Sequence, residues 1–320
     1  MLIDLHCDTI SVLLKNVQDR ELRKNNLCVD IEKLRQGGSL AQFFALYVNM
    51  ENVKNPFEYA MVMLDKFYQE VSANSTEIAI ARDYNEMMAN MEKGKISAFL
   101  TLEEGGVIKG KLENLRNFYR LGVRLMTLTW NYPNEIGYPN FEWRYQAQGL
   151  TAFGKEVVAE MNRLGMIIDV SHLSDQGFYD VASLSQQPFI ASHSNSRAMT
   201  NHPRNLTDDM IRILAENGGV LGLNFAASFL GSSETSKIED MIRHANHIYQ
   251  VGGAEVLAIG TDFDGTAPNL DIIHAGQMNQ LRDALAKNGF TASELDKIWY
   301  QNSGRLIKEV CHSINNIDSN

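Results

Sequence analysis

The sequence has little of what marks secreted or multidomain proteins. It contains only three cysteines, Cys7, Cys28 and Cys311, and they are widely separated. An odd and scattered set does not indicate a disulfide framework, so a reducing cytoplasm fits it best. There are only six prolines, and no stretch rich in proline, glycine or serine indicates a linker. We therefore expect a single domain over residues 1–320.

Long apolar runs and an excess of basic residues are also absent. No run of about 18 apolar residues is present to span a bilayer. The first residues do not resemble a secretory signal, and the polar tail carries no lipid-anchor motif. Lys and Arg number 29 against 39 Asp and Glu, a net charge of −10. This balance argues against nucleic acid or an anionic membrane as a partner, and we expect a soluble cytoplasmic protein.

Apolar residues are nevertheless ample, at 44% of the chain. Short apolar runs alternate with amphipathic segments of helical period, such as 112–121, 155–164, 207–217 and 238–251. Strands that alternate with helices indicate a parallel sheet, and eight of them favour a closed (β/α)8 barrel over an open doubly wound sheet. The expected strands are 2–5, 43–48, 96–102, 124–128, 166–170, 188–191, 219–223 and 256–259.

Polar side chains follow most of these runs, where active sites of such barrels lie. His6 and Asp8 are two residues apart on an extended segment, so their side chains point to the same side. His172 and His193 end consecutive strands, which favours metal ligation over two unrelated structural histidines. Imidazole and carboxylate together suit zinc or a similar divalent ion.

Glu103 and Glu104 end another strand, and alternation sends them in opposite directions. Only one can readily enter the site, and periodicity alone leaves the choice nearly even. The flexible Gly105-Gly106 turn favours Glu104 as the ligand, with Glu103 behind the site or in solvent.

Three imidazoles and two carboxylates exceed what one catalytic zinc usually takes. They suit two metal ions about 3.5–4 Å apart, with Glu104 as the bridge and a shared hydroxide available near neutral pH. Zinc is expected, although other divalent transition metals accept the same ligands. Asp262, after the last strand, can transfer a proton, whereas Asp264 is expected to form a turn. Arg204 either pairs with a substrate carboxylate or is a helix-capping or surface charge, and spacing alone does not decide.

With these residues in place, the sequence resembles the membrane (renal-type) dipeptidase family of the amidohydrolase barrels. The resemblance runs along most of the chain and rests on DLHCDT (4–9), EGG (104–106), LGVR (121–124), LT (128–129), GLT with FG (149–154), IDVSH (168–172), SHS (192–194), RN (204–205) and DFDG (262–265).

The resemblance implies a binuclear zinc site. One ion is held by His6, Asp8 and Glu104, and the other by Glu104, His172 and His193. It also selects Glu104 over Glu103 and makes it a catalytic residue together with Asp262. It assigns Asp262 to proton transfer and Arg204 to the substrate's C-terminal carboxylate. A homodimer is implied by family likeness alone.

Two positions depart from the family pattern. Trp130 replaces an oxyanion-binding histidine of the mammalian members, and Phe229 corresponds to a tyrosine of the substrate pocket. An indole N–H donates one hydrogen bond but cannot become cationic, so the metals carry more of the oxyanion or Asn131 assists. We expect Trp130, Asn131 and Phe229 to contact the substrate.

The leading hypothesis is therefore a zinc dipeptidase that hydrolyses the amide bond of dipeptides, including those with a D-residue at the C-terminal position. The apolar character of Trp130 and Phe229 motivates an alternative, in which the same barrel acts on an N-acyl amino acid, a β-lactam or another cyclic amide. A third hypothesis is a catalytically silent barrel that binds metal or a metabolite; the full ligand set together with Asp262 argues against it.

Overall fold

All eight apolar runs form strands of one parallel sheet. The computed structural model describes residues 1–15, 21–267 and 269–311. Its strands are β1 (Leu2–Cys7), β2 (Ser39–Tyr47), β3 (Ile78–Ile80), β4 (Ile96–Glu103), β5 (Val123–Thr127), β6 (Ile167–Asp169), β7 (Ile190–Ser194), β8 (Val220–Leu223) and β9 (Leu257–Ile259). The sequence did not predict β3, whose three residues are too short to show a period.

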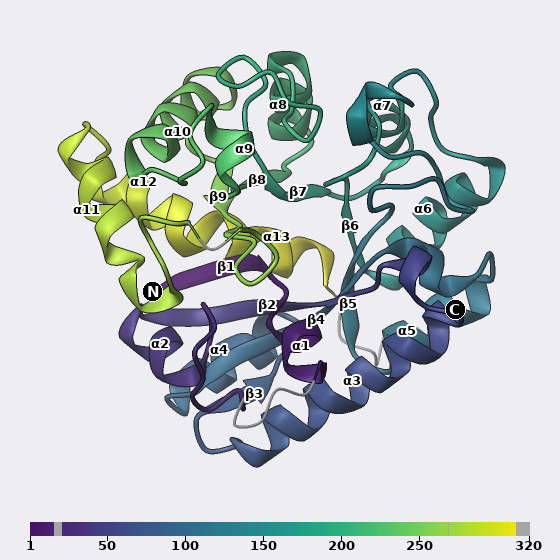
Figure 1. Ribbon diagram of the computed structural model, residues 1–320, viewed down its shortest axis with the longest axis horizontal. Coiled ribbons are helices and arrows are strands. Elements are labelled where there is room, and N and C mark those ends of the chain that lie inside the picture. Colours follow the sequence, from purple (N-terminus) through teal and green to yellow (C-terminus); the bar gives the residue numbers. More distant parts are fainter. Residues whose placement is uncertain (16–20, 268, 312–320) are drawn as a thin grey trace.

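The sheet closes on itself. Strand β1 pairs with β2 and β9, β2 also pairs with β4, and β4 to β9 follow in chain order. The fold is therefore the predicted eight-stranded (β/α)8 barrel, with helices around the strands (Figure 1). Strand β3 lies outside this ring and pairs only with the first residues of β4, such as Ile78 with Ile96. The prediction of one domain over 1–320 stays a prediction, because 312–320 lie outside the described residues.

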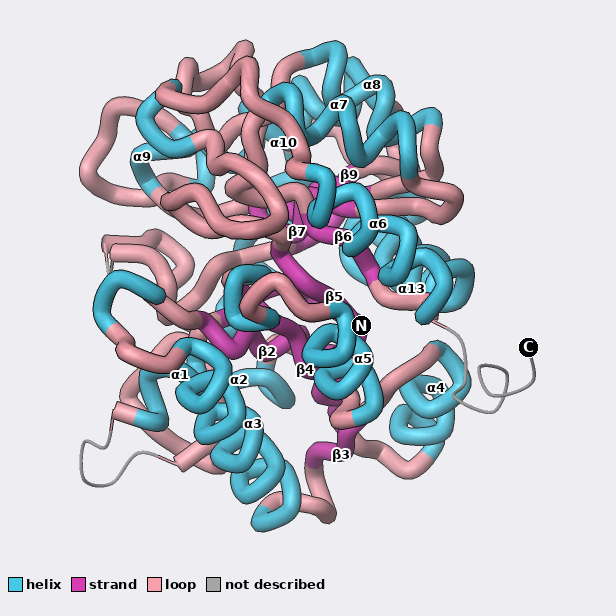
Figure 2. The backbone as a smooth tube through the Cα atoms, turned by 90° about the vertical axis from the view of Figure 1, so that its right-hand side faces the viewer, coloured by secondary structure: helices cyan, strands magenta, loops and turns pink. Residues whose placement is uncertain are grey.

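Helices connect the strands and lie on the outside of the barrel (Figure 1 and Figure 2). They are α1 (Thr9–Leu14), α2 (Ile31–Gln36), α3 (Pro56–Ala73), α4 (Tyr84–Glu92), α5 (Leu112–Arg120), α6 (Ala152–Leu164), α7 (Asp175–Leu184), α8 (Asp208–Glu216), α9 (Ala227–Leu230), α10 (Ile238–Gly252), α11 (Asn279–Lys287), α12 (Ala292–Asp296) and α13 (Asn302–Val310). Single helical turns are η1 (Met50–Asn52), η2 (Gly105–Ile108), η3 (Phe141–Trp143), η4 (Ala275–Gln277) and η5 (Lys297–Gln301). None of the helices in the described ranges is both long and apolar enough to cross a membrane.

Several helices begin where the sequence supplies a side-chain cap. The Thr151 hydroxyl accepts a hydrogen bond from Gly154 N at the start of α6, and Thr207 accepts one from Met210 N at the start of α8. Such caps satisfy backbone donors that the first helical turn leaves free. Each cap determines the residue at which its helix begins, and therefore where the preceding loop ends.

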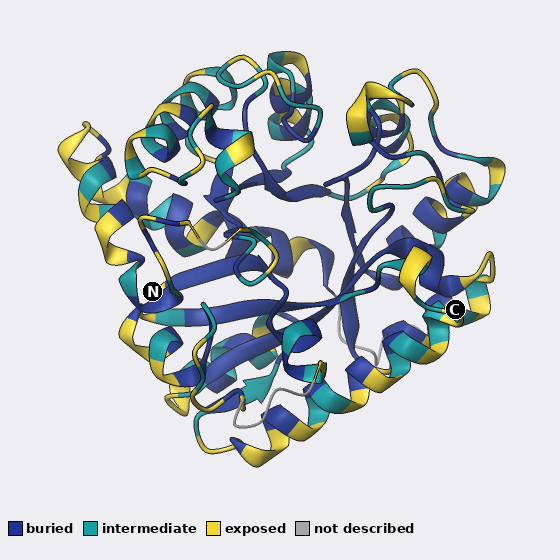
Figure 3. Cartoon of the chain, in the orientation of Figure 1, coloured by how far each residue is buried: buried dark blue, intermediate teal, exposed yellow. Residues whose placement is uncertain are grey.

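The core has two layers, one inside the barrel and one between the strands and the helices. Phe43 and Phe99 stack inside the barrel with ring centroids 4.6 Å apart, among the apolar side chains of the other strands. The strands are buried while the helices expose their outer faces (Figure 3). Nearer the carboxyl ends of the strands the buried residues become polar, as at Glu103 and His193. The apolar layer therefore forms the floor of a polar site.

Two glycines allow neighbouring strands to approach closely beneath this site. A Cβ atom at Gly222 would lie 1.9 Å from the carbonyl oxygen of Ser192, and one at Gly260 would lie 1.7 Å from the same oxygen. Both contacts are with backbone, so a side-chain rearrangement cannot relieve them. The strands β7, β8 and β9 can hold this spacing only with glycine at both positions.

We predict that Gly260→Ala lowers the free energy of unfolding by about 1–3 kcal/mol or more, because overpacking against backbone must displace a strand. Gly304→Ala in α13 is the matched control, since its nearest neighbour would be 3.7 Å away and alanine favours a helix. Urea unfolding of both variants measures the difference. Equal stability of the two variants would contradict the predicted steric role of Gly260.

Candidate metal centre and active-site cavity

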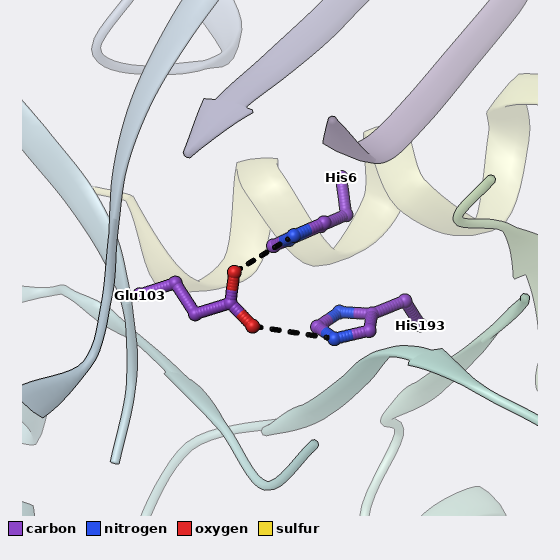
Figure 4. A group of neighbouring side chains, drawn as sticks. All are labelled: His6, Glu103 and His193. Atoms are coloured by element: carbon purple, nitrogen blue, oxygen red, sulfur yellow. Dashed lines mark ion pairs between the residues drawn. The ribbon is translucent and has the colours of Figure 1, made fainter. Parts of the chain in front are cut away.

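Four polar side chains from four strands converge at the carboxyl end of the barrel. His6 comes from β1, Glu103 is the last residue of β4, His193 lies in β7, and His172 follows β6. All four are buried. Figure 4 shows the Glu103 carboxylate pointing between the rings of His6 and His193. The structure thus brings together residues that are nearly 190 positions apart in the chain.

The two oxygens of Glu103 face different histidines. Oε2 lies 3.1 Å from His6 Nε2, whereas Oε1 lies 3.1 Å from His172 Nε2 and 3.6 Å from His193 Nε2. Burial alone would raise the pKa of Glu103, but His6 and the other two imidazoles hold it well below its usual value. Glu103 is therefore an ionised carboxylate that divides the histidines into two groups, as a bridging ligand does.

Hydrogen bonds on the far side of two rings orient them toward Glu103. The Asn131 side-chain oxygen lies 2.9 Å from His172 Nδ1, and the Ser192 hydroxyl lies 2.7 Å from His193 Nδ1. Ser192 itself donates to Asp169 Oδ2 at 2.6 Å, so it is free to accept a hydrogen bond from His193. In this arrangement both rings carry their proton on Nδ1 and present the Nε2 lone pair to the site.

These two imidazoles are held neutral as well as oriented. Burial, reinforced by the Arg204 charge, lowers the pKa of His172 to about 4, and burial together with His6 lowers that of His193 well below its usual value. Their Nε2 atoms are only 3.1 Å apart. Two neutral nitrogen lone pairs at this separation suit a shared approach to a cation, which requires unprotonated imidazole.

Asp8 and Asp262 complete the site on the side of His6. Asp8 Oδ2 lies 3.4 Å and Asp262 Oδ1 lies 3.9 Å from His6 Nε2. Burial is the main cause that raises the pKa of Asp262 to about 7, with Asp8 and Glu103 adding to it. Asn224 donates a hydrogen bond to the other Asp262 oxygen at 2.9 Å. A carboxyl group with a pKa near neutrality can take up and return a proton.

Three non-glycine residues around this site have left-handed backbone conformations. They are His172 (φ 68°), Asp262 (φ 60°) and Asp264 (φ 68°). Such conformations are uncommon outside glycine and concentrate at functional sites. Asp264 accepts hydrogen bonds from the Thr9 hydroxyl and from Cys28 N, at 2.6 and 2.7 Å. It therefore shapes the loop, in agreement with its expected structural role.

The position of Glu104 corrects the prediction that it bridges the metals. Its side chain turns away from the histidines, and its oxygens accept hydrogen bonds from Trp130 N at 2.9 Å, from Gly106 N at 2.5 Å and from the Asn134 amide. The reason is the alternation of β4, which carries Glu103 to the inside of the barrel and Glu104 to the outside. Glu103, and not Glu104, lies among the histidines, and Glu104 anchors the loop after β5.

Arg204 lies beside the histidines as a buried cation. Its guanidinium donates to the carbonyl oxygen of His193 at 3.1 Å and to the Ser194 hydroxyl at 3.3 Å. In the described part of the chain it forms no ion pair, and its Nε has no hydrogen-bond partner. Burial lowers the pKa of Arg204 to about 10, so it stays charged at neutral pH. This geometry argues against a surface or capping role and leaves a free site for an anion.

A cavity of about 430 Å³ connects these groups. Its lining includes Trp130, Asn131 and Phe229, all three expected to contact a substrate. The oxygen of Asn131 is engaged by His172, so Asn131 acts on that ring in addition to facing the cavity. Sequence reasoning missed Tyr47, which packs edge-on against Trp130 at 5.0 Å and also lines the cavity. Tyr47 lies four residues after Phe43 on β2, so strand alternation places both side chains on the inner side of the barrel. This parity is the signal that could have identified Tyr47.

The residues present fit a pair of divalent transition-metal ions. Three imidazoles and three carboxylates lie at this site. The candidate ligand atoms of His6, Glu103 and His193 lie within 4.8 Å of one another, and so do those of His6, Asp8 and Asp262. Among the described residues, His6 Nδ1 and Asp8 Oδ1 are buried without a hydrogen-bond partner, and His6 Nε2 has carboxylate neighbours but no aligned hydrogen bond. Buried polar atoms are rarely left unsatisfied, and nitrogen and carboxylate donors suit zinc.

Comparison with known proteins gives a consistent match. A model of the membrane dipeptidase family, peptidase family M19, matches residues 1–320. Dipeptidase 3 of Homo sapiens is 32% identical over 275 residues, which cover 83% of this chain and 56% of that protein. A dipeptidase of Schizosaccharomyces pombe is 32% identical over 253 residues, 74% of this chain and 60% of that protein. The chain thus spans less than two thirds of the length of either relative.

Two solved structures share the whole fold. A metallopeptidase from Rhodobacter sphaeroides, liganded with a phosphinate mimic of the dipeptide L-Ala-D-Ala, has a TM-score of 0.88 and 27% identity over 97% of this chain and 99% of that chain. The dipeptidase AC, a metallopeptidase of family M19, has a TM-score of 0.89 and 28% identity over 98% and 99%.

The contrast between the two adjacent glutamates is testable. We predict that Glu103→Ala loses bound metal, because both groups of ligands depend on its carboxylate. Glu104→Ala is the matched control and retains metal, but it is less stable by about 1–3 kcal/mol, since buried backbone donors lose their acceptor. Elemental analysis after dialysis and thermal unfolding measure the two effects. Metal loss in Glu104→Ala with retention in Glu103→Ala would reverse the assignment.

Proposed function

Because this chain belongs to the membrane dipeptidase family, a family of metal-dependent peptidases, we propose that it is a binuclear zinc dipeptidase. His6, Asp8 and Glu103 hold one ion, and Glu103, His172 and His193 hold the other. When bound, the two zinc ions supply a hydroxide at neutral pH and polarise the substrate carbonyl. The ligand set differs from the one expected from the sequence only in the exchange of Glu104 for Glu103.

The observation that carries this proposal is the division of the Glu103 oxygens. One oxygen faces His6 and the other faces His172 and His193, all within 3.6 Å. A carboxylate that serves a single ion has no need to direct its two oxygens at separate groups of imidazole nitrogens. Glu103 would then help to hold both ions, and this role accounts for the arrangement.

Asp262 is proposed to move the proton. It lies on the His6 side of the site, beside Asp8, and its Asn224 contact holds one oxygen while the other faces His6. It accepts a proton as water attacks the amide carbon and returns it to the leaving amine nitrogen. This transfer balances the reaction, because hydrolysis adds one proton to the amine and one hydroxyl group to the acyl carbon.

Arg204 is proposed to bind the carboxylate of the substrate. It is a fixed, buried cation beside a metal-ligating histidine, and it lacks an ion pair within the described residues. A carboxylate held there places the neighbouring amide bond next to the histidine cluster. The free amino group of a dipeptide then falls among Asp8, Asp262 and Glu103, which favour a cation. This spacing supports dipeptides over longer peptides as substrates.

A D-residue at the C-terminal position is part of the proposal. The support comes from the Rhodobacter sphaeroides metallopeptidase, which was solved with a phosphinate mimic of L-Ala-D-Ala and shares nearly the whole fold. The cytoplasmic location and the homodimer expected from the sequence stay predictions.

The packing of Trp130 supports one alternative substrate class. The indole packs against Tyr47 and Tyr132 and lines the cavity where relatives are expected to carry a histidine. This apolar wall suits an N-acyl amino acid, a β-lactam or another cyclic amide. A substrate screen separates the two classes, since the alternative requires a strong preference for N-blocked compounds over free dipeptides.

We predict that the purified protein with zinc hydrolyses dipeptides but not the corresponding tripeptides. A chelator should abolish the activity and added zinc should restore it, as measured by amino acid release across a panel with L- and D-residues at the second position. Failure to cleave any dipeptide in this panel would refute the proposed function.

Asp262→Asn should lower kcat by about 10²–10⁴-fold without loss of bound metal, because only proton transfer is removed. Asp283→Asn, at an exposed position on α11, is the control and should leave kcat unchanged. Kinetics combined with elemental analysis distinguishes this outcome from metal loss. Full activity in Asp262→Asn would exclude its role.

Arg204→Met should raise KM far more than it lowers kcat, since the carboxylate contact exists in the substrate complex before the transition state. The loss of a charge-assisted hydrogen bond predicts a change of about 10-fold or more. An amidated dipeptide, which has no carboxylate, should not discriminate between the variant and the wild type. Equal KM values for the free dipeptide would contradict the assignment.

A further inference from the structure

A second cavity adjoins the first on the far side of Arg204. It has a volume of about 510 Å³ and shares Asn131, His172, Arg204 and Phe229 with the cavity of the metal centre. The two cavities are therefore lobes of one cleft, with Arg204 at their junction. The glutamate and aspartates of the metal centre line only the first lobe. The second lobe has a different lining and therefore a different chemistry.

The second lobe presents aromatic surfaces to its contents. Its walls include Phe141, Trp143, His202 and Phe229, which we call the aromatic lobe. His202 packs against Phe229 with ring centroids 4.5 Å apart. Burial, followed by the charges of Arg204 and Arg197, lowers the pKa of His202 to about 4, so it is a neutral ring at physiological pH. Flat, uncharged surfaces of this kind favour a large apolar or aromatic ligand group.

The loop that carries Phe141 and Trp143 is held in a strained shape. Glu142 and Trp143 both have positive φ values, 50° and 63°. The Trp143 ring lies 4.9 Å below the guanidinium of Arg197, which is itself fixed by a two-fold contact with Asp175 at 2.6 and 2.8 Å. Although it is held in this way, Trp143 remains 37% exposed. A strained and partly exposed tryptophan fixed at the edge of a cleft is poorly explained by packing alone.

The single acidic residue that lines this lobe does not change its character. Glu142 pairs with Arg144 at 2.7 Å, and its side chain is about half exposed. Its charge is therefore compensated outside the lobe. The side-chain amides in the lining are those of Asn201 and of Asn131, which His172 already engages, while Arg204 and His172 lie at the junction with the first lobe.

We propose that the aromatic lobe binds the side chain of the substrate's C-terminal residue and selects large apolar, above all aromatic, side chains. This inference rests on the proposed function, in which Arg204 holds the substrate carboxylate. The α-carbon that bears this carboxylate also bears the C-terminal side chain, so that side chain starts at the junction of the two lobes. The scissile amide must extend the other way, toward the histidines, and the aromatic lobe remains for the side chain.

The proposal is tested by the ratio of two kcat/KM values. The substrates are Ala-Phe and Ala-Ala, each with either enantiomer at the second position. The wild type should prefer phenylalanine by about 10-fold or more, because a large side chain gains that much from an apolar pocket. Trp143→Ala should reduce the ratio about 10-fold, and Phe141→Ala on the same loop should reduce it in the same direction. Leu184→Ala removes an exposed apolar side chain from α7 and is the matched control, with an unchanged ratio.

Two outcomes would overturn the proposal. The first is a wild-type ratio near one for both enantiomers. The second is that Trp143→Ala changes the kcat/KM ratio of Phe-Ala to Ala-Ala instead of the ratio of Ala-Phe to Ala-Ala. That result would assign the lobe to the N-terminal side chain. Thermal unfolding of each variant identifies a folding defect, and Phe141→Ala then supplies the test if Trp143→Ala does not fold.

A binding measurement separates this proposal from the proposed function. Calorimetric titration of the zinc-loaded protein with 3-phenylpropanoate and propanoate measures binding at the carboxylate and side-chain sites without turnover, because neither compound has an amide bond. If no dipeptide is hydrolysed, a phenylalanine preference in binding that Trp143→Ala removes still supports the aromatic lobe, while the dipeptidase proposal fails. Equal affinity for the two compounds overturns the lobe whatever the activity.

Discussion

The site depends on keeping one ionised carboxylate, Glu103, away from water. Burying a charge is costly unless opposite charges or hydrogen-bond donors compensate for it. Here the largest compensation is the charge of His6, because Glu103 and Asp8 hold the pKa of His6 well above its usual value despite burial. The rings of the other two histidines are aimed by their own neighbours. The Asp169–Ser192 pair aims His193, and Asn131 aims His172. In β1, an irregular register between Asp4 and Cys7 coincides with the segment that carries His6. The barrel supplies the rigid frame that these separate adjustments require.

Most of the fold could be predicted because buried parallel strands have a distinct composition and regular spacing. The choice between Glu103 and Glu104 failed although its signal was present in β4. Ile96, Ala98, Leu100 and Leu102 form an apolar face that packs toward the helices, whereas Phe99 lies inside the barrel. Thr101 and Glu103 share the parity of Phe99. In a strand that is otherwise apolar, the polar residues therefore identify the face that points into the barrel. The Gly105-Gly106 pair after the strand does not show which glutamate lies on that face.

Other parts of the site could not be derived from sequence spacing. Arg204 was equally compatible with a surface charge, and only its burial beside His193 distinguishes the alternatives. The loop from β5 to α6 is long and irregular, so no period indicates where Trp143 lies. Its position depends on a contact with Arg197, which belongs to another loop. Such contacts between loops depend on the geometry of side chains that are distant in the sequence, and the local hydrophobic pattern gives no information about them.

The seam between β1 and β9 has a consequence for how the protein is made. Asp4 accepts hydrogen bonds from the backbone and hydroxyl of Thr261, and Asp264 binds Thr9, so the first strand is secured by the last. These partners are about 255 residues apart. During translation, about 255 further residues must be made before the segment with His6 and Asp8 has these neighbours. Such non-local closure slows folding, and the site at the carboxyl end of the barrel is complete only after β1 and β9 have paired.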